Sequence, residues 1–255
     1  MLTTLGYDEL AWIFVALAFG GFTKGLTGLG LPLITVPVLA GVFGVERAVL
    51  IMVIPSSLLN FYPAWTHRDQ SSELPEIWHI LLGAIPGVAI GATVLRLASD
   101  RFLATSLALW IIAYLLLRLF HPEFSISAAA RRRWSPVVGM SAGALQAATG
   151  ISAPIIAPYM DALGLKPRAY VFAVCACFGV FATVHLGLVV LSGAYTASLI
   201  GQSMLAILPA LAFIQVGFWA RKFVSQRWFD WIIRLTLVVM TIRILYGAWF
   251  TQTAA

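Results

Sequence analysis

The sequence predicts an all-α polytopic membrane protein built from two repeats. Hydrophobic residues make up 61% of the 255 residues and charged residues only 10%, far from the balance of a soluble domain. Several apolar stretches reach the roughly 20 residues that a helix needs to cross a bilayer. A six-residue pattern also occurs twice, 122 positions apart, each time inside a long apolar stretch.

The repeated pattern reads TGLGLP at 27–32 and TGISAP at 149–154. Glycine and proline are poor residues for an uninterrupted helix. Their placement at matched points of two hydrophobic segments is typical of transporters whose binding site is built from broken helices. The pattern therefore predicts a duplicated architecture with one interrupted helix in each half.

Eight apolar segments follow one another along the chain: 10–44, 47–65, 77–97, 101–120, 135–163, 169–192, 196–220 and 228–250. They predict a first transmembrane repeat (1–120), a charged cytoplasmic connector (121–134) and a second transmembrane repeat (135–255). Each repeat holds one long segment and three ordinary spans.

Other marks recur between the two halves. The dipeptide Arg-Ala recurs at an offset of 121, at 47–48 and 168–169, and a proline recurs at an offset of 123, at 86 and 209. Glycines at 21 and 25 match those at 139 and 143 at an offset of 118. The smaller offset implies about four extra residues in the second copy before its Thr-Gly pair.

The long segments decide the architecture. Residues 10–44 would form a helix of over about 50 Å, whereas the hydrocarbon core is only about 30 Å thick. One straight helix is excluded, so the segment either crosses once as a broken helix with a long tail or folds back as a hairpin. Non-helical backbone at that depth is tolerated only against protein or a water-filled cavity.

Positive charge distinguishes the two alternatives. Single crossings make the halves parallel and divide the loop Lys and Arg residues eight against five, whereas hairpins make the halves inverted and divide them ten against three. The inverted arrangement gathers Arg68, Arg118, Arg131, Arg132, Arg133, Lys166, Arg168, Arg221, Lys222 and Arg227 on one side and leaves Arg47, Arg96 and Arg101 on the other. The positive-inside rule favours inverted repeats with both termini outside the cytoplasm. The acidic stretch 7–9 argues against a cleavable signal, which would need a basic region there.

Lys24 is the candidate residue with the clearest chemical meaning. It lies between Gly21 and Gly25 near the middle of the first long segment. A buried ammonium is costly and normally faces a cavity or a partner, although a lysine can also reach the interface along its own stem. Its central position favours a functional role.

The two glycine blocks are the second candidate. Glycine lets the chain approach a ligand closely, and free N–H groups at the start of a half-helix attract anions. Close packing of helices is the alternative role of these glycines. The expected substrate-binding residues are Lys24, Gly25, Thr27, Gly28, Gly30, Gln146, Thr149, Gly150 and Ser152.

Four further polar residues are candidates for a proton relay or for gating. Arg47 and Arg168 each open the span that follows a long segment, where they either mark the membrane interface or attract an anion. Asn60 and His185 are isolated polar residues inside their spans. Such residues hold helices together more often than they bind substrate, but a histidine can also pass protons.

The types of residue that are missing narrow the function. All ten carboxylates lie in loops or near segment ends, whereas a cation pathway usually places acidic residues within the spans. No metal, haem or P-loop signature occurs, so we expect no cofactor, no metal and no ATP hydrolysis. Cys175 and Cys177 share one span and are interpreted as small core residues. The net charge of +6 reports membrane topology better than a nucleic-acid partner.

Residues 21–32, followed by Pro37, resemble the first glycine-rich motif of the sulfite exporter TauE/SafE family, and residues 143–158 resemble its second-half counterpart. The resemblance covers nearly the whole chain. It implies movement of sulfite, sulfonates or related organic anions across the bacterial inner membrane. The second copy departs from a fully glycine-rich pattern, with alanine at 147, 148 and 153.

Together, these observations predict a secondary transporter that moves a small sulfur-containing or carboxylic anion by alternating access. Coupling to the proton gradient is a hypothesis. The partners expected are the anion and the lipid bilayer, with no nucleic acid, and the oligomeric state is not predicted. An anion channel is the main alternative, and an intramembrane enzyme is a weaker one because only His185 could serve it. We expect no enzymatic activity.

Overall fold

The computed structural model describes residues 6–28, 31–120, 126–223 and 225–251. The first half contains α1 (Tyr7–Thr27), α2 (Leu31–Phe43), α3 (Val45–Thr66), the short η1 (Arg68–Glu73), α4 (Ile77–Leu97) and α5 (Asp100–Phe120). The second contains α6 (Ala128–Thr149), α7 (Ala153–Ala162), α8 (Pro167–Leu191), α9 (Ala197–Ala220), α10 (Gln226–Tyr246) and η2 (Gly247–Thr251).

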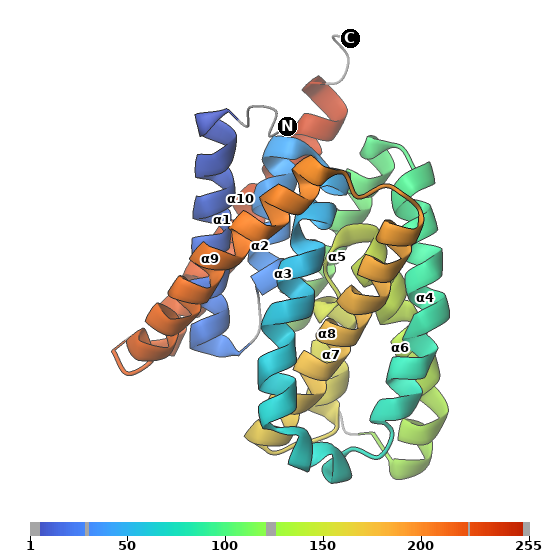
Figure 1. The fold of residues 1–255 in the computed structure, drawn as a ribbon. Coiled ribbons are helices and arrows are strands. Elements are labelled where there is room, and N and C mark those ends of the chain that lie inside the picture. The colour runs from blue at the N-terminus through green and yellow to red at the C-terminus, as the bar shows by residue number, and fades with distance from the viewer. Residues whose placement is uncertain (1–5, 29–30, 121–125, 224, 252–255) are drawn as a thin grey trace.

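The described residues confirm the all-α polytopic class. They form helices without any strand (Figure 1). Seven of the described helices are long and apolar enough to cross a membrane, namely α1, α3, α4, α5, α8, α9 and α10. Because α6 begins at Ala128, part of the connector expected at 121–134 is helical.

Both long segments are broken at the matched glycines. α1 ends at Gly28 (φ 77°, ψ −15°), and the Gly28 N–H donates to the carbonyl of Lys24 at 2.8 Å. α6 ends at Gly150 (φ 77°, ψ −4°), and its N–H donates to the carbonyl of Gln146 at 2.8 Å. A left-handed glycine is a common way to end a helix, because glycine has no Cβ to clash there. The repeated pattern in the sequence thus produces a repeated backbone geometry.

The matched caps also set the correspondence between the halves. α1 and α6 run unbroken up to Gly28 and Gly150, so residues at equal distances before the caps correspond. Gly21 then matches Gly143, at the same offset of 122 as the caps. The four extra residues expected in the second copy are therefore not needed.

Each long segment folds back as a hairpin. Arg47, just after α2, forms an ion pair with Glu9 in the first turn of α1 (2.8 Å). The N–H of Ile126, just before α6, donates to the carbonyl of Ala162 at the end of α7 (3.2 Å). The two ends of each segment therefore lie side by side, which is the folded-back alternative expected from the sequence.

Helices α3 and α8, which follow the two hairpins, pack against each other in opposite directions. Near the start of α3, the carbonyl of Leu50 accepts a hydrogen bond from the Tyr195 hydroxyl, which lies beyond the end of α8 (3.2 Å). Beyond the other end of α3, Glu73 pairs with Lys166 at the start of α8 (3.0 Å). Figure 1 shows α3 running down and α8 running up.

Glycines bring two other pairs of helices into close contact. A Cβ on Gly21 would lie 2.6 Å from the carbonyl oxygen of Ala210, and one on Gly25 would lie 2.2 Å from that of Ile214, so α1 rests directly on the backbone of α9. Gly87 of α4 lies as close to the backbone of α6, at Met140. Small residues permit this approach between helices.

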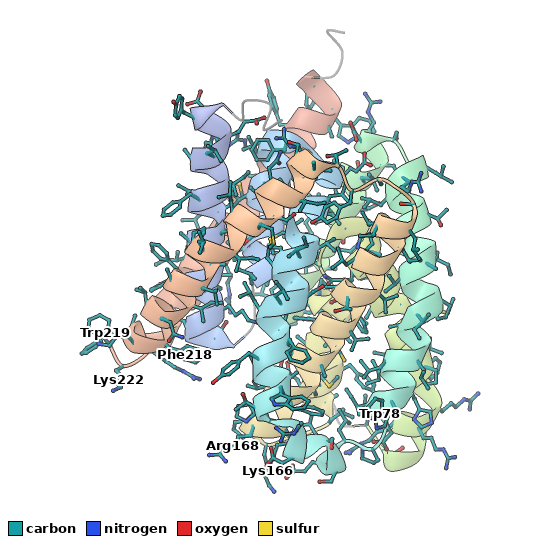
Figure 2. All side chains as sticks on the ribbon, in the orientation of Figure 1. Trp78, Lys166, Arg168, Phe218, Trp219 and Lys222 are labelled. Carbon is teal, nitrogen blue, oxygen red and sulfur yellow. The ribbon has the colours of Figure 1, made fainter. Side chains whose placement is uncertain are left out.

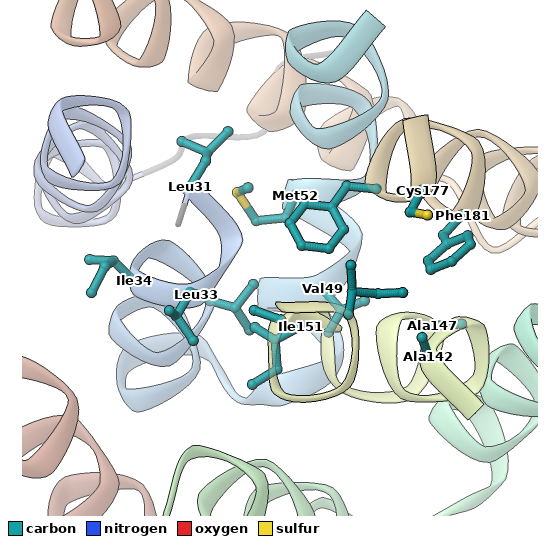
Figure 3. Close-up of a cluster of buried hydrophobic side chains, with 14 of the residues drawn as sticks. Leu31, Leu33, Ile34, Val49, Met52, Ala142, Ala147, Ile151, Cys177 and Phe181 are labelled. Atoms are coloured by element: carbon teal, nitrogen blue, oxygen red, sulfur yellow. The ribbon is translucent and has the colours of Figure 1, made fainter. Parts of the chain in front are cut away.

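The buried core lies where the two halves meet. Figure 3 shows Leu33 of α2 and Val49 and Met52 of α3 beside Ile151 in the second break. Cys177 of α8 belongs to the same cluster, and its thiol and that of Cys175 are buried and free. Both cysteines are therefore core residues in the structure.

Basic side chains gather at one end of the molecule. Figure 2 shows Lys166, Arg168 and Lys222 at the lower end, opposite the end where α1 begins. Arg131 lies in the same region, since its guanidinium donates to the carbonyls of Ile126 and Leu163 in the loops beside α6 and α7.

Candidate functional site

Lys24 and Asn60 form a buried polar pair between α1 and α3. The ammonium of Lys24 donates to Oδ1 of Asn60 at 2.6 Å, and the two residues are only 6% and 0% exposed. The amide of Asn60 is held in turn, because its Nδ2 donates to the carbonyl of Ser56 at 2.8 Å. The Lys24 side chain therefore ends inside the protein and does not extend to the surface.

The positive charge of Lys24 has no carboxylate to balance it within the described residues. The ion pairs found there join Arg47 to Glu9 and Lys166 to Glu73, and both lie at the ends of helices. Taking an ammonium out of water without a counter-charge is strongly unfavourable. The arrangement can therefore hold an anion that supplies the missing negative charge.

In the second half, Gln146 occupies the position that corresponds to Lys24. Its side-chain carbonyl accepts a hydrogen bond from the hydroxyl of Ser152 at 2.8 Å across the break. The Thr149 hydroxyl donates to the carbonyl of Leu145 at 2.8 Å. All three predicted side chains of this break are buried, and the bond between Ser152 and Gln146 joins its two sides.

The first break is arranged differently. The Thr27 hydroxyl donates to the carbonyl of Thr23 at 2.9 Å, and Gly28 forms the left-handed cap. Gly25 faces the backbone of α9, so it serves helix packing. Gly30 was expected at the site and lies outside the described residues.

Each break lies against the opposite half of the chain. A Cβ on Gly150 would lie 2.8 Å from a methyl of Val36 on α2 and 3.2 Å from a methyl of Val49 on α3. A Cβ on Gly28 would lie 3.8 Å from a methyl of Val171 on α8. The two predicted binding segments therefore both lie at the contact between the halves.

The structure does not bring Arg47 and Arg168 to Lys24. Arg47 forms the ion pair with Glu9 at the start of α1, and its Nε donates a hydrogen bond to Gln202 of α9 (3.3 Å). Its guanidinium also lies over the Phe43 ring. Arg168 is exposed at the lower end (Figure 2). Arg47 thus closes the first hairpin, and Arg168 belongs to the basic end of the molecule.

His185 is buried on α8, at 2% exposure. Its Nε2 has no hydrogen-bond partner in the described part of the chain. It lines a cavity of about 210 Å³ between α3, α4 and α8, together with Glu46 and Arg96. The sequence indicated His185 as an isolated polar residue in a span and as a candidate for a proton relay or for gating, and that role stays a prediction.

Sequence reasoning missed Ser56, which lies one turn before Asn60 on α3. Its hydroxyl is buried and, like His185 Nε2, finds no partner among the described residues. The available signal was a polar run, Ser56-Ser57, in the same apolar span as Asn60. No group of three or more metal-ligating side chains occurs in the residues described.

Two interrupted helices that each meet the opposite half of the chain, with a buried basic group one turn before the first break, are features of membrane transporters. The chain belongs to the sulfite exporter TauE/SafE family, whose model matches residues 13–244. This is a transporter family, which agrees with the expectation that the protein is not an enzyme. No curated protein and no solved structure matches the chain significantly.

Proposed function

We propose that this protein is a secondary transporter that binds a small oxyanion of the sulfite or organosulfonate class beside Lys24. The observation that carries the proposal is the buried ammonium of Lys24, held by Asn60 at 2.6 Å and lacking a carboxylate among the described residues. A bound anion would supply the counter-charge that the site needs. A cation would add to the unbalanced charge.

The second break would complete the site. Ser152 and Gln146 are hydrogen-bonded to each other, and an anion could exchange that bond for donors from the Ser152 hydroxyl and the Gln146 amide. Backbone N–H groups at the starts of α2 and α7 would add partial positive charge. Short carboxylates could use the same donors, so the substrate class is defined by charge and size.

The repeats are inverted in this proposal, and the halves rock against each other to alternate access. The hairpin contacts, the antiparallel packing of α3 and α8, and the position of each break against the opposite half support it. The basic lower end would face the cytoplasm of a bacterial inner membrane, with both termini on the other side.

Thermal unfolding of the purified protein tests binding. A ligand at 100 times its dissociation constant stabilises the folded state by about 2.7 kcal/mol, which corresponds to about 5–10 °C for a chain of this size. We expect such a shift with one or more of sulfite, thiosulfate, taurine, sulfoacetate and short carboxylates.

Lys24→Met should abolish the shift, because methionine keeps most of the length of the side chain and removes its charge. Lys222→Met is the matched control, since Lys222 is exposed at the lower end of the molecule (Figure 2). An unchanged shift with Lys24→Met would remove Lys24 from the site.

Transport itself is tested in proteoliposomes with radiolabelled sulfite. An alternating-access carrier exchanges internal for external substrate, so unlabelled sulfite inside should accelerate uptake of the label. A channel would instead give single-channel current and no accelerated exchange. Proton coupling is also part of the proposal, and uptake that does not respond to an imposed pH gradient would remove that part alone.

A further inference from the structure

The cavity between α3, α4 and α8 lies near the end of the molecule opposite the basic one. It lies where α3 begins and where α4 and α8 end (Figure 1). Its volume of about 210 Å³ has room for several water molecules. The polar residues that line it are Glu46, Thr93, Arg96, His185 and Ser192.

The interface of α3 and α8 leads from this cavity to the Lys24–Asn60 pair. Gly179 of α8 lies against Asn60, because a Cβ added to Gly179 would lie 3.5 Å from the Cβ of Asn60. Towards the cavity, the Leu50 carbonyl meets the Tyr195 hydroxyl. Because the helices are antiparallel, the stretch between these two contacts contains Ser56 on α3 and His185 on α8.

Both residues in this stretch carry a buried polar atom without a partner, Ser56 Oγ and His185 Nε2. Neighbouring polar groups on α3 are satisfied, since Ser57 donates to the Val53 carbonyl (3.0 Å) and Asn60 donates to the Ser56 carbonyl (2.8 Å). An unsatisfied buried polar group is costly and usually marks a functional role or a bound molecule.

We propose that this stretch is the outer arm of the anion pathway, in which an oxyanion moving between the cavity and Lys24 accepts hydrogen bonds from Ser56 and His185. The inference rests on the proposed function and adds a second, weaker binding station to it. His185 would donate through Nε2–H. Arg96 and Glu46 both line the cavity, and both are exposed to solvent that screens their opposite charges, so the donors of the stretch itself carry the proposal.

Four variants test the path in proteoliposomes with radiolabelled sulfite. Ser56→Ala and His185→Leu remove the donors, and each should slow uptake about tenfold or more, the effect of losing one hydrogen bond to a charged group. Ser56→Thr and His185→Gln keep a donor and should retain most of the rate. Ser57→Ala is the matched control, because its hydroxyl already has a backbone partner.

Stability separates this role from a structural one. Ser56→Ala and His185→Leu replace unsatisfied polar groups with apolar ones, so the melting temperature should rise or stay the same while transport falls. The sulfite-induced thermal shift, which reports the Lys24 site, should persist in both. If the uptake rate falls only in variants whose melting temperature also falls, the proposal would be overturned.

Labelling provides a measurement that does not depend on transport. Leu50 lines the cavity, whereas its neighbour Ile51 is fully buried in the core. Leu50→Cys should react with a membrane-impermeant sulfonate-bearing thiol reagent and Ile51→Cys should not, with Cys175 and Cys177 buried in both. Equal reactivity of the two would mean that the cavity is not selectively open to water, which would exclude an arm that begins there.

The outcomes distinguish the two proposals. Absence of any sulfite uptake by the unmodified protein would overturn both. Normal uptake by the unmodified protein that stays within twofold in Ser56→Ala and His185→Leu would overturn the outer arm alone.

Discussion

Alanine at the two helix breaks should have unequal effects on stability, although Gly28 and Gly150 share the same φ of 77°. Placing alanine in the left-handed region costs about 1–2 kcal/mol at either position. At Gly28 little is added, since the new Cβ would lie 3.8 Å from the nearest side chain. At Gly150 it would lie 2.8 Å from Val36 and 3.2 Å from Val49, and overpacking of this kind typically costs about 1–3 kcal/mol more.

The expected loss of stability is therefore about 1–2 kcal/mol for Gly28→Ala and about 2–5 kcal/mol for Gly150→Ala. Thermal unfolding of the detergent-solubilised variants, measured by the fraction that remains monodisperse, ranks the two. Asparagine provides the control because it tolerates the left-handed conformation. Gly28→Asn should recover most of the lost stability, whereas Gly150→Asn should not, since its larger side chain meets the same valines.

Equal losses at the two positions would refute the reasoning, because the neighbours of Gly150 would then have no effect. The same conclusion follows if Gly150→Asn is as stable as Gly28→Asn. If Gly28→Asn is no better than Gly28→Ala, the left-handed conformation itself is not what the first break requires.

Two further predictions concern packing and hydrogen bonding. Gly25→Ala should destabilise the protein severely, because the new Cβ would lie 2.2 Å from the carbonyl oxygen of Ile214. Gly187→Ala, with open space around it, should be neutral or slightly stabilising. The yields of folded protein compare the two variants. Ser152→Ala and Gln146→Ala should each lower the free energy of unfolding by about 1–3 kcal/mol, because each leaves a buried partner unpaired. In thermal unfolding, the double variant should lose clearly less stability than the sum of the two single variants. Full additivity would contradict the hydrogen bond between them.

The sequence predicted the breaks because glycine acts locally. Gly28 and Gly150 adopt a conformation that other residues rarely take, so their effect on the helix could be foreseen without knowing what surrounds them. The hairpins followed from the excess length of residues 10–44 over the membrane thickness, together with the distribution of positive charge. These predictions depend on chain length and residue type alone.

Contacts between distant helices were not predictable in the same way. Lys24 and Asn60 were both singled out, but their hydrogen bond joins residues 36 positions apart and depends on where the fold places α1 relative to α3. Gly25 was expected near the ligand, whereas the packing of α1 on α9 directs it to Ile214. A helix has several faces, and only the tertiary packing determines which one meets the site.

The hydropathy pattern was also less clear where charge and helix overlap. The basic run at 131–133 was interpreted as part of a connector, but α6 already begins at Ala128. The guanidinium of Arg131 binds carbonyls beside the two ends of that hairpin, so a charged residue can belong to the helix itself. Composition alone does not separate a basic loop from a basic first turn.

The unlike residues at the matched positions before the caps, lysine in one half and glutamine in the other, have an electrical consequence. If a monovalent sulfonate travels together with α1, its charge and that of the ammonium cancel, and the step is electroneutral. A divalent anion would carry one net negative charge through the membrane field, at about 2.3 kcal/mol per 100 mV. The valence of the cargo would then decide whether the membrane voltage acts on the loaded step or only on the return of the empty carrier, whose ammonium is unbalanced.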